Sequence, residues 1–127
     1  MQILIVEPSA DLGKVLSRSL EDSGHTVSIA HTAQQGIEKA DKASPDMIIL
    51  ELLMARHNGL EFVHELRSYA EWQKVPIILY SHISKEELGL DDELLAQLGI
   101  VKHLYKPAAS LSGLVKAVES NLAPNSI

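Results

Sequence analysis

The sequence contains no cysteine. A disulfide framework, a thiolate metal site and a cysteine nucleophile are therefore excluded, and the composition fits a reducing compartment. Basic residues are also scarce, because 11 Lys and Arg stand against 17 Asp and Glu and give a formal net charge of -6. A nucleic-acid surface needs clustered Lys and Arg, so we expect no direct binding of nucleic acid.

Long apolar runs are missing as well. No apolar segment approaches the about 18 residues that a membrane-spanning helix needs, and the amino terminus has neither a basic leader nor a small-residue cleavage site. We therefore expect a cytoplasmic protein without a membrane partner. The 127 residues suit one domain with a real core. We place that domain at residues 1–123, followed by a tail at 124–127 that could be the start of a linker.

Short apolar runs alternate with segments of helical periodicity. The expected strands lie at residues 3–6, 26–29, 47–50, 77–80 and 101–105, and the segment 26–29 alternates as a less buried strand near a sheet edge should. Ser9, Thr32 and Asn58 are expected to cap the first three helices, and a turn at Ser84, interrupted by Gly89, precedes a firmer helix that ends near residue 99. A last helix carries apolar residues at helical spacing, namely Leu111, Leu114, Val115, Val118 and Leu122. The alternation predicts an α/β fold with a parallel sheet and helices on both faces.

Polar side chains follow four of the five runs, at Glu7, Glu51, Ser81 and Lys106. Taken singly, each is typical of a solvated loop or a turn. In a parallel sheet, however, the carboxyl ends of all strands lie at one edge, where ligand sites form. The sequence therefore predicts a site at this edge, with Glu51 at the end of the most apolar strand.

Four motifs carry a resemblance to a known family. They are ILIVE at 3–7, PDMIILE at 45–51 with NGLE at 58–61, PIILYS at 76–81 and LYKP at 104–107. In this order and at this spacing, the chain resembles the receiver domains of two-component response regulators over nearly its whole length. The resemblance implies a flavodoxin-like (βα)5 sandwich with parallel strand order 2-1-3-4-5. It also implies a cis peptide bond between Lys106 and Pro107.

The resemblance also implies roles for the edge residues. In the family, an aspartate at the position of Glu51 accepts a phosphoryl group from a histidine kinase. Two acidic residues of the family, at the positions that Glu7 and Pro8 occupy here, help to bind Mg²⁺. A threonine or serine stands at Ser81 and the paired lysine at Lys106. A switch aromatic stands at the position of His103, which is either an ordinary half-buried polar residue or a pH-sensitive replacement for the aromatic.

Two departures from the family pattern affect the chemistry. Pro8 offers no carboxylate, so one oxygen ligand of Mg²⁺ is lost, and Glu7 and Glu51 are only weak candidates for holding the ion. Glu51 is one methylene longer than aspartate, which displaces its carboxylate by roughly 1.5 Å and can cost about 10²-fold in phosphoryl transfer. We therefore expect weak or absent Mg²⁺ binding and no other cofactor. Glu51 could instead pair with Lys106 and partly imitate a phosphoryl group.

The leading hypothesis is a degenerate, phosphorylation-independent receiver, or pseudo-receiver, without enzymatic activity. Its partner would be a protein or a second copy, docked on the surface of the fourth helix, fifth strand and fifth helix, where a histidine kinase or an output domain is also conceivable. Candidate residues of that surface are Tyr105, Leu111 and the acidic turn from Glu86 and Glu87 to Asp91 and Asp92.

Two alternatives remain open. The first is a working phosphoacceptor that uses Glu51 with Mg²⁺ and turns over its own phosphoryl group. The second is a transition-metal site built from Glu7, Glu51, His57 and His82. Among the other residues, Ala55 stands where the family has proline and predicts a more mobile loop, and His25, His31 and His64 are expected to face solvent.

Overall fold

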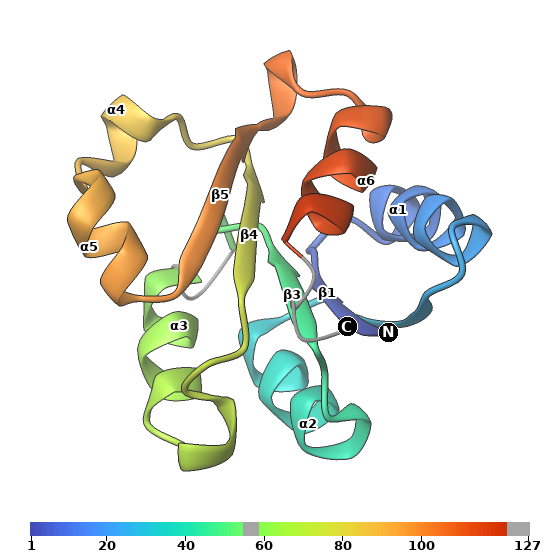
Figure 1. The fold of residues 1–127 in the computed structure, drawn as a ribbon, viewed down its shortest axis with the longest axis horizontal. Helices are drawn as coiled ribbons and strands as arrows, with labels where there is room; N and C mark the ends of the chain where they lie inside the picture. The colour runs from blue at the N-terminus through green and yellow to red at the C-terminus, as the bar shows by residue number, and fades with distance from the viewer. Residues whose placement is uncertain (55–58, 122–127) are drawn as a thin grey trace.

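A single parallel sheet organises the molecule, as a computed structural model shows for residues 1–54 and 59–121 (Figure 1). Its strands run in the order β2-β1-β3-β4-β5. Their bounds are β1 (Gln2–Val6), β2 (Thr26–Ala30), β3 (Met47–Leu50), β4 (Ile77–Ser81) and β5 (Ile100–Tyr105). The predicted strands and the flavodoxin-like order are confirmed.

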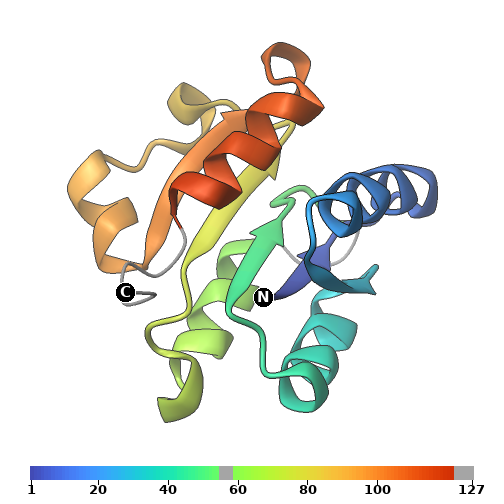
Figure 2. The ribbon, with the colours of Figure 1, turned by 45° about the vertical axis from the view of Figure 1, so that its right-hand side comes forward.

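Helices cover both faces of this sheet (Figures 1 and 2). Side chains of α1 (Ala10–Asp22) and α6 (Leu111–Ser120) pack on one face. Side chains of α2 (Ala33–Ala43), α3 (Gly59–Arg67) and α5 (Asp92–Gln97) pack on the other. Strand β3 lies between these layers and is buried at every position, which explains why its sequence is an uninterrupted apolar run.

Side-chain caps fix the helix starts as the sequence predicts. Ser9 Oγ accepts a hydrogen bond from the Leu12 backbone N–H at 3.1 Å, and Thr32 Oγ1 accepts one from Gln35 at 3.1 Å. Each cap satisfies a backbone donor that the first turn of a helix leaves unpaired. The predicted cap at Asn58 lies outside the described residues.

The fourth connection is split into two short helices instead of one. Ser84 and Glu87 form a capping box at α4 (Lys85–Leu88), and Gly89 ends this helix in the left-handed region at a φ of 71°. Asp91 then caps α5, and an ion pair between Lys85 and Asp92 joins the two pieces. The described part of the chain therefore holds six α-helices, one more than the alternating pattern predicted, together with the 3-10 helices η1 (Ala70–Trp72) and η2 (Lys106–Ala108).

Arg67 ties the end of α3 to two neighbouring segments. Its guanidinium donates to the carbonyl oxygens of Trp72 at 2.6 Å, Val75 at 2.7 Å and Leu98 at 2.9 Å. Gly99 lies against it with a φ of 75°, and a Cβ at this position would overlap the guanidinium. Burial lowers the pKa of Arg67 from its ordinary value. This contact closes the end of the sheet opposite the strands' carboxyl ends.

Helical periodicity overestimates burial at two positions. Val15 is 45% exposed and Leu94 is 44% exposed, although both fall in apolar patterns. Their neighbours Leu16 and Leu95 occupy the positions that face the sheet, so these two side chains are turned toward solvent. Within the described residues, we find no helix with the length and apolarity to traverse a bilayer.

Candidate functional site

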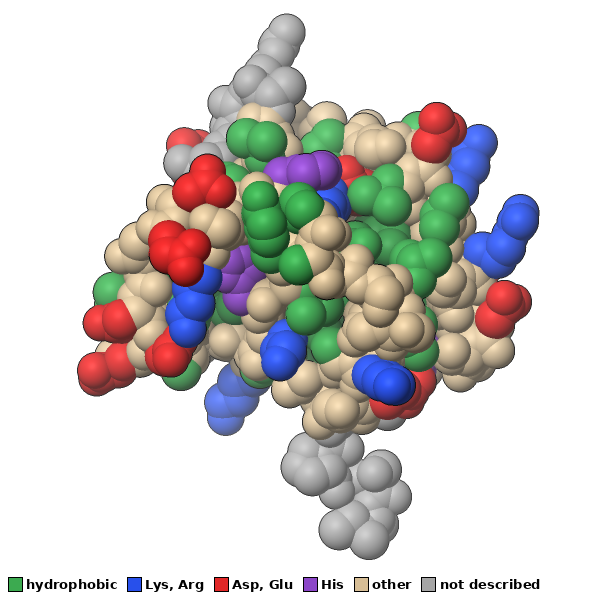
Figure 3. All heavy atoms as spheres, turned by 90° about the horizontal axis from the view of Figure 1, so that it is seen from above, with side chains coloured by type: hydrophobic (Ala, Val, Ile, Leu, Met, Phe, Trp, Pro, Cys, Tyr) green, Lys and Arg blue, Asp and Glu red, His purple; other side chains and the backbone are tan. Residues whose placement is uncertain are grey.

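The four polar residues that follow the strands do meet at the carboxyl edge of the sheet. Parallel pairing sets Val6 beside Leu50 and Leu50 beside Leu79, so the residues after these strands emerge side by side. Glu7, Glu51 and Ser81 are 4%, 3% and 0% exposed and are the only buried polar residues in the described part of the chain. Seen from this end of the molecule, hydrophobic side chains surround the centre and most charges lie at the periphery (Figure 3).

Lys106 joins the two buried carboxylates. Its Nζ lies 2.6 Å from Glu7 Oε1 and 2.8 Å from Glu51 Oε1, and it stands 5.6 Å from the centre of the Tyr80 ring. The implied cis bond between Lys106 and Pro107 is wrong, because none of the described peptide bonds is cis. Instead, both residues belong to the first turn of η2, where proline is well tolerated and the lysine side chain still reaches the site.

Both oxygens of Glu51 are fully engaged. Oε1 accepts from Lys106 Nζ, from the His82 backbone N–H at 3.0 Å and from His82 Nδ1 at 3.1 Å. Oε2 accepts from the Leu53 backbone N–H at 2.9 Å and from the Ser81 hydroxyl. A carboxylate offers about four lone-pair sites, so these five donors leave none of them free.

The hydrogen bonds decide the ionisation of Glu51. Burial by itself raises the pKa of this carboxyl, but the donors from Leu53, Lys106, Ser81 and His82 outweigh burial and lower the pKa from 4.5 to about 2. Glu51 is therefore an anion at neutral pH. The cluster of Glu7, Glu51 and Lys106 carries one more negative than positive charge when both glutamates are ionised.

The donor set does not fit Mg²⁺, the ion that the family resemblance implies. An octahedral Mg²⁺ needs several free oxygen ligands with near-ideal geometry. Here the Lys106 ammonium occupies the space between Glu7 Oε1 and Glu51 Oε1, and Glu7 Oε2 accepts a hydrogen bond from the Ser9 backbone N–H at 3.0 Å. Pro8 adds no side-chain ligand.

The transition-metal alternative also finds no support in the geometry. No group of three or more His, Cys, Asp or Glu side chains is arranged to hold a metal ion anywhere in residues 1–54 and 59–121. His57, one of the four candidate ligands, lies outside the described residues, as does Ala55 with its predicted loop mobility. His82 and Glu51 are in contact, but through a hydrogen bond between their side chains.

The remaining histidines behave differently from one another. His103 is half-buried, and its Nε2 donates to the Ile83 carbonyl at 2.8 Å, which fixes the loop after β4. His25 was expected to face solvent, and this is wrong. Its side chain is 7% exposed, and Glu119 of α6 lies 2.9 Å from its Nε2. His31 and His64 are exposed as expected, and His31 Nδ1 donates to the Glu7 carbonyl.

Sequence reasoning missed the contact between His82 and Glu51, because it considered His82 only as a metal ligand. The sequence did contain a signal for this contact. Strands β3 and β4 are parallel neighbours, so the residue directly after Ser81 leaves the sheet next to the end of β3, where Glu51 lies. It likewise missed Leu53, whose backbone N–H two residues after Glu51 folds back onto the carboxylate.

The fold and the site define a doubly wound α/β domain with a polar cluster at the carboxyl edge of its sheet. The model of the response regulator receiver domain matches residues 3–119, and the chain belongs to this family. A crystal structure of the chemotaxis protein CheY4 of Vibrio cholerae superposes with a TM-score of 0.83 at 26% identity, covering 95% of this chain and 98% of that one.

Two curated relatives are longer proteins. The KDP operon transcriptional regulatory protein KdpE of Escherichia coli is 36% identical over 105 residues, which are 77% of this chain and 45% of that protein. A protein-glutamate methylesterase/protein-glutamine glutaminase of Treponema denticola is 30% identical over 126 residues, 97% of this chain and 33% of that protein. The chain thus spans less than half the length of either relative.

Proposed function

We propose that this receiver domain is a pseudo-receiver, which signals without accepting a phosphoryl group on Glu51. The observation that carries the proposal is the engagement of the Glu51 carboxylate by five donors. A nucleophilic carboxylate needs a free lone pair directed at the phosphorus atom, and Glu51 has none to offer. The comparisons show only the receiver family, so the proposal rests on the site of this chain.

The same contacts support a domain that is permanently held in a state similar to the phosphorylated one. In this state the Glu51 carboxylate takes the place of the phosphoryl group, because it already binds the hydroxyl of Ser81 and the ammonium of Lys106. The imitation is partial, since a carboxylate carries one negative charge and a phosphoryl group carries about -1.5 to -2. His103 belongs to this state as well, because its bond to Ile83 fixes the loop that follows Ser81.

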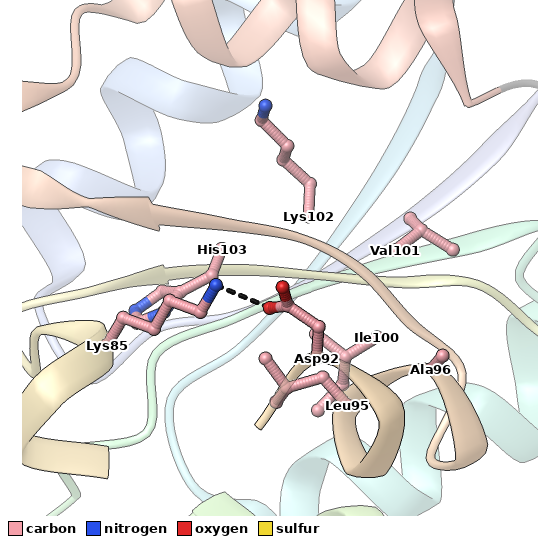
Figure 4. A pocket seen from close by; sticks show the side chains of 8 residues that line it. All are labelled: Lys85, Asp92, Leu95, Ala96, Ile100, Val101, Lys102 and His103. Carbon is pink, nitrogen blue, oxygen red and sulfur yellow. Dashed lines mark ion pairs between the residues drawn. The ribbon is translucent and has the colours of Figure 1, made fainter. Parts of the chain in front are cut away.

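The docking surface in this proposal is formed by α4, α5, β5 and α6. A groove of about 540 Å³ opens between α5 and β5, with Leu95 and Ile100 among its lining residues and the ion pair of Lys85 and Asp92 at one side (Figure 4). Tyr105, 40% exposed, adds apolar surface beside it. Leu111 contributes less than expected, because it is half-buried against the core. The occupant is a protein partner, such as an output domain or a kinase, or a second copy.

A cytoplasmic location belongs to the same proposal, since the cysteine-free composition fits a reducing compartment. The domain would bind its partner without catalysing a reaction.

The test is exposure of the purified protein to acetyl phosphate and Mg²⁺, followed by intact mass and NMR. We expect no adduct on Glu51 and no chemical-shift changes at micromolar Mg²⁺ or with beryllofluoride. A stoichiometric acyl phosphate on Glu51 would refute the proposal.

Matched variants separate the two proposed causes of the lost phosphorylation, which are the longer acid at residue 51 and the missing acid at residue 8. Glu51→Asp restores the shorter acid, Pro8→Asp restores the second acid of the family, and the double variant restores both. We expect phosphorylation only when Asp replaces Glu51, and faster in the double variant, because the second acid returns a ligand to Mg²⁺. Pro8→Asp alone is the control, since it keeps Glu51. If that control is phosphorylated at Glu51, the lost acid was the only defect.

The docking surface is tested separately by sedimentation of the wild type and Tyr105→Lys over a range of concentrations. A wild-type dimer that the substitution dissociates identifies a second copy as the occupant. A monomer at all concentrations leaves a different protein as the occupant, and a dimer unaffected by the substitution contradicts this surface.

A further inference from the structure

His82 joins the buried site to the solvent. Its side chain is 58% exposed, whereas the Glu51 side chain that it contacts is 2% exposed. The His82 backbone N–H and ring Nδ1 both lie against Glu51 Oε1, at 3.0 Å and 3.1 Å. Two contacts from one residue to one oxygen hold the imidazole in a defined orientation at the edge of the sheet.

The partner of Nδ1 fixes the tautomer of this ring. An ionised carboxylate only accepts hydrogen bonds, so the proton of a neutral imidazole must reside on Nδ1. The lone pair then resides on Nε2, for which the described residues supply no hydrogen-bond partner, and the His82 side chain is 58% exposed. His103 lacks this arrangement, because its Nε2 already donates to the Ile83 carbonyl.

Glu51 also favours positive charge on the ring. When Nε2 forms a bond to an electrophile, the imidazole becomes a cation, and a carboxylate on Nδ1 stabilises that cation as in histidine–carboxylate pairs of enzymes. Lys106, 2.8 Å from the same oxygen, offsets part of the local negative charge that would repel an anionic reagent. The arrangement is therefore suited to a nucleophilic imidazole.

We propose that His82 Nε2 is a phosphoryl-accepting site for donors whose phosphoryl group is bound to nitrogen. The Nε2 lone pair attacks the phosphorus of phosphoramidate, the P–N bond to the protonated amine breaks, and ammonia leaves with the bonding electrons. The product carries the phosphoryl group on Nε2 and one positive charge on the ring, whose Nδ1–H faces Glu51. Glu51 acts here as a positioning residue, because it touches the ring and not the phosphorus. The site is distinct from the phosphoacceptor position at residue 51.

Potassium phosphoramidate is the probe, added to the full chain in the presence of EDTA so that no divalent metal takes part. It is a monoanion at neutral pH, which limits repulsion by the cluster. We expect one phosphoryl group per chain, assigned to His82 by tandem mass spectrometry and ³¹P NMR. The rate at His82 should exceed that at exposed His64 by about tenfold, because a charge-assisted hydrogen bond stabilises the ring cation. Among the described residues, His64 makes no ion pair with a carboxylate.

Two variants test the mechanism. His82→Gln should remove the fast adduct and leave only slow labelling of the kind expected at His64. Glu51→Gln, which keeps an acceptor oxygen but loses the charge, should slow His82 to the rate of His64. The ring ¹⁵N shifts of His82 should report the Nδ1–H tautomer in the wild type and lose this signature in Glu51→Gln. A purely structural role of Glu51 would leave the tautomer unchanged in a folded variant.

The outcomes also separate this inference from the proposed function. Phosphohistidine is acid-labile but stable in alkali, whereas an acyl phosphate on Glu51 is hydrolysed in alkali. An adduct on Glu51 alone overturns both proposals. No adduct, or His82 reacting no faster than His64 within the wild type, overturns only this inference and leaves the pseudo-receiver proposal standing.

Discussion

Replacing Lys106 by methionine removes the cation that Glu7 and Glu51 share and keeps a side chain of similar length. The side chains of Lys106, Glu7 and Glu51 are 7%, 5% and 2% exposed, so water cannot readily replace the lost ammonium. Removing one partner of a buried ion pair typically costs about 3–5 kcal/mol. Because Glu51 keeps four other donors, we expect the lower end, about 3 kcal/mol at pH 7.

The assay is urea unfolding at 25 °C, followed by the fluorescence of Trp72, the single tryptophan. The midpoint should fall while the slope with urea stays constant, because the folded and unfolded surfaces are unchanged. In the variant, the two carboxylates lie close together in the folded state without the cation that they shared, so protonation of one of them relieves repulsion. The difference in unfolding free energy between wild type and variant should therefore shrink as the pH is lowered toward about 4.

Two controls make the result interpretable. Lys116→Met changes an exposed lysine of α6 and should cost less than about 0.5 kcal/mol. The double variant Glu7→Gln/Lys106→Met removes one of the two anions and should recover part of the loss. If Lys106→Met unfolds within about 0.5 kcal/mol of the wild type at pH 7, the shared ion pair does not contribute as argued here.

Three further predictions concern stability. Gly99→Ala should lower the free energy of unfolding in urea by about 3 kcal/mol, because a left-handed φ is strained for alanine and the new Cβ displaces Arg67. Gly89→Ala is the control, since Gly89 has a similar φ but open space around it, and should cost only about 1 kcal/mol. Equal losses in the two variants would exclude the steric argument. Arg67→Met should cost about 3 kcal/mol by the same assay, since three carbonyl oxygens lose their donor; a loss below about 1 kcal/mol would mean that water replaces the guanidinium. The pKa of Glu51 is lowered from 4.5 to about 2 on folding, so the stability that its anion contributes is complete above pH 4.5 and is lost as the pH falls toward 2. We expect that loss to be about 2 kcal/mol after screening, and Glu51→Gln should lack it, so parallel pH profiles of the two proteins would contradict the assignment.

The order of the strands and the edge that carries the site follow from short-range patterns. A strand covered on both faces is apolar at every position, as β3 is, and parallel strands deliver the residues after them to a single edge. For this reason the sequence alone predicts that Glu7, Glu51, Ser81 and Lys106 lie together. The break at Gly89 was also visible, because glycine after a short capped turn is typical of a helix end.

The contacts that the sequence did not predict depend on the path of loops and on packing between distant segments. His82 reaches Glu51 only because the chain turns over the edge after β4. Arg67 finds carbonyl oxygens in two segments that no local pattern connects to α3. His25 looks like a turn residue, yet its side chain is 7% exposed and contacts Glu119 of α6. Side-chain partners of this kind are set by tertiary structure.

The complete occupation of the Glu51 carboxylate has a consequence for regulation. An ordinary phosphorylated switch has a lifetime, because its signal decays when the acyl phosphate is hydrolysed and must be renewed at the expense of ATP. Under the proposed function, the signal of this domain does not decay by hydrolysis, and no ATP is consumed to maintain it. A cell could then adjust its output only through the number of copies it synthesises or degrades, or through competition among the proteins that bind it.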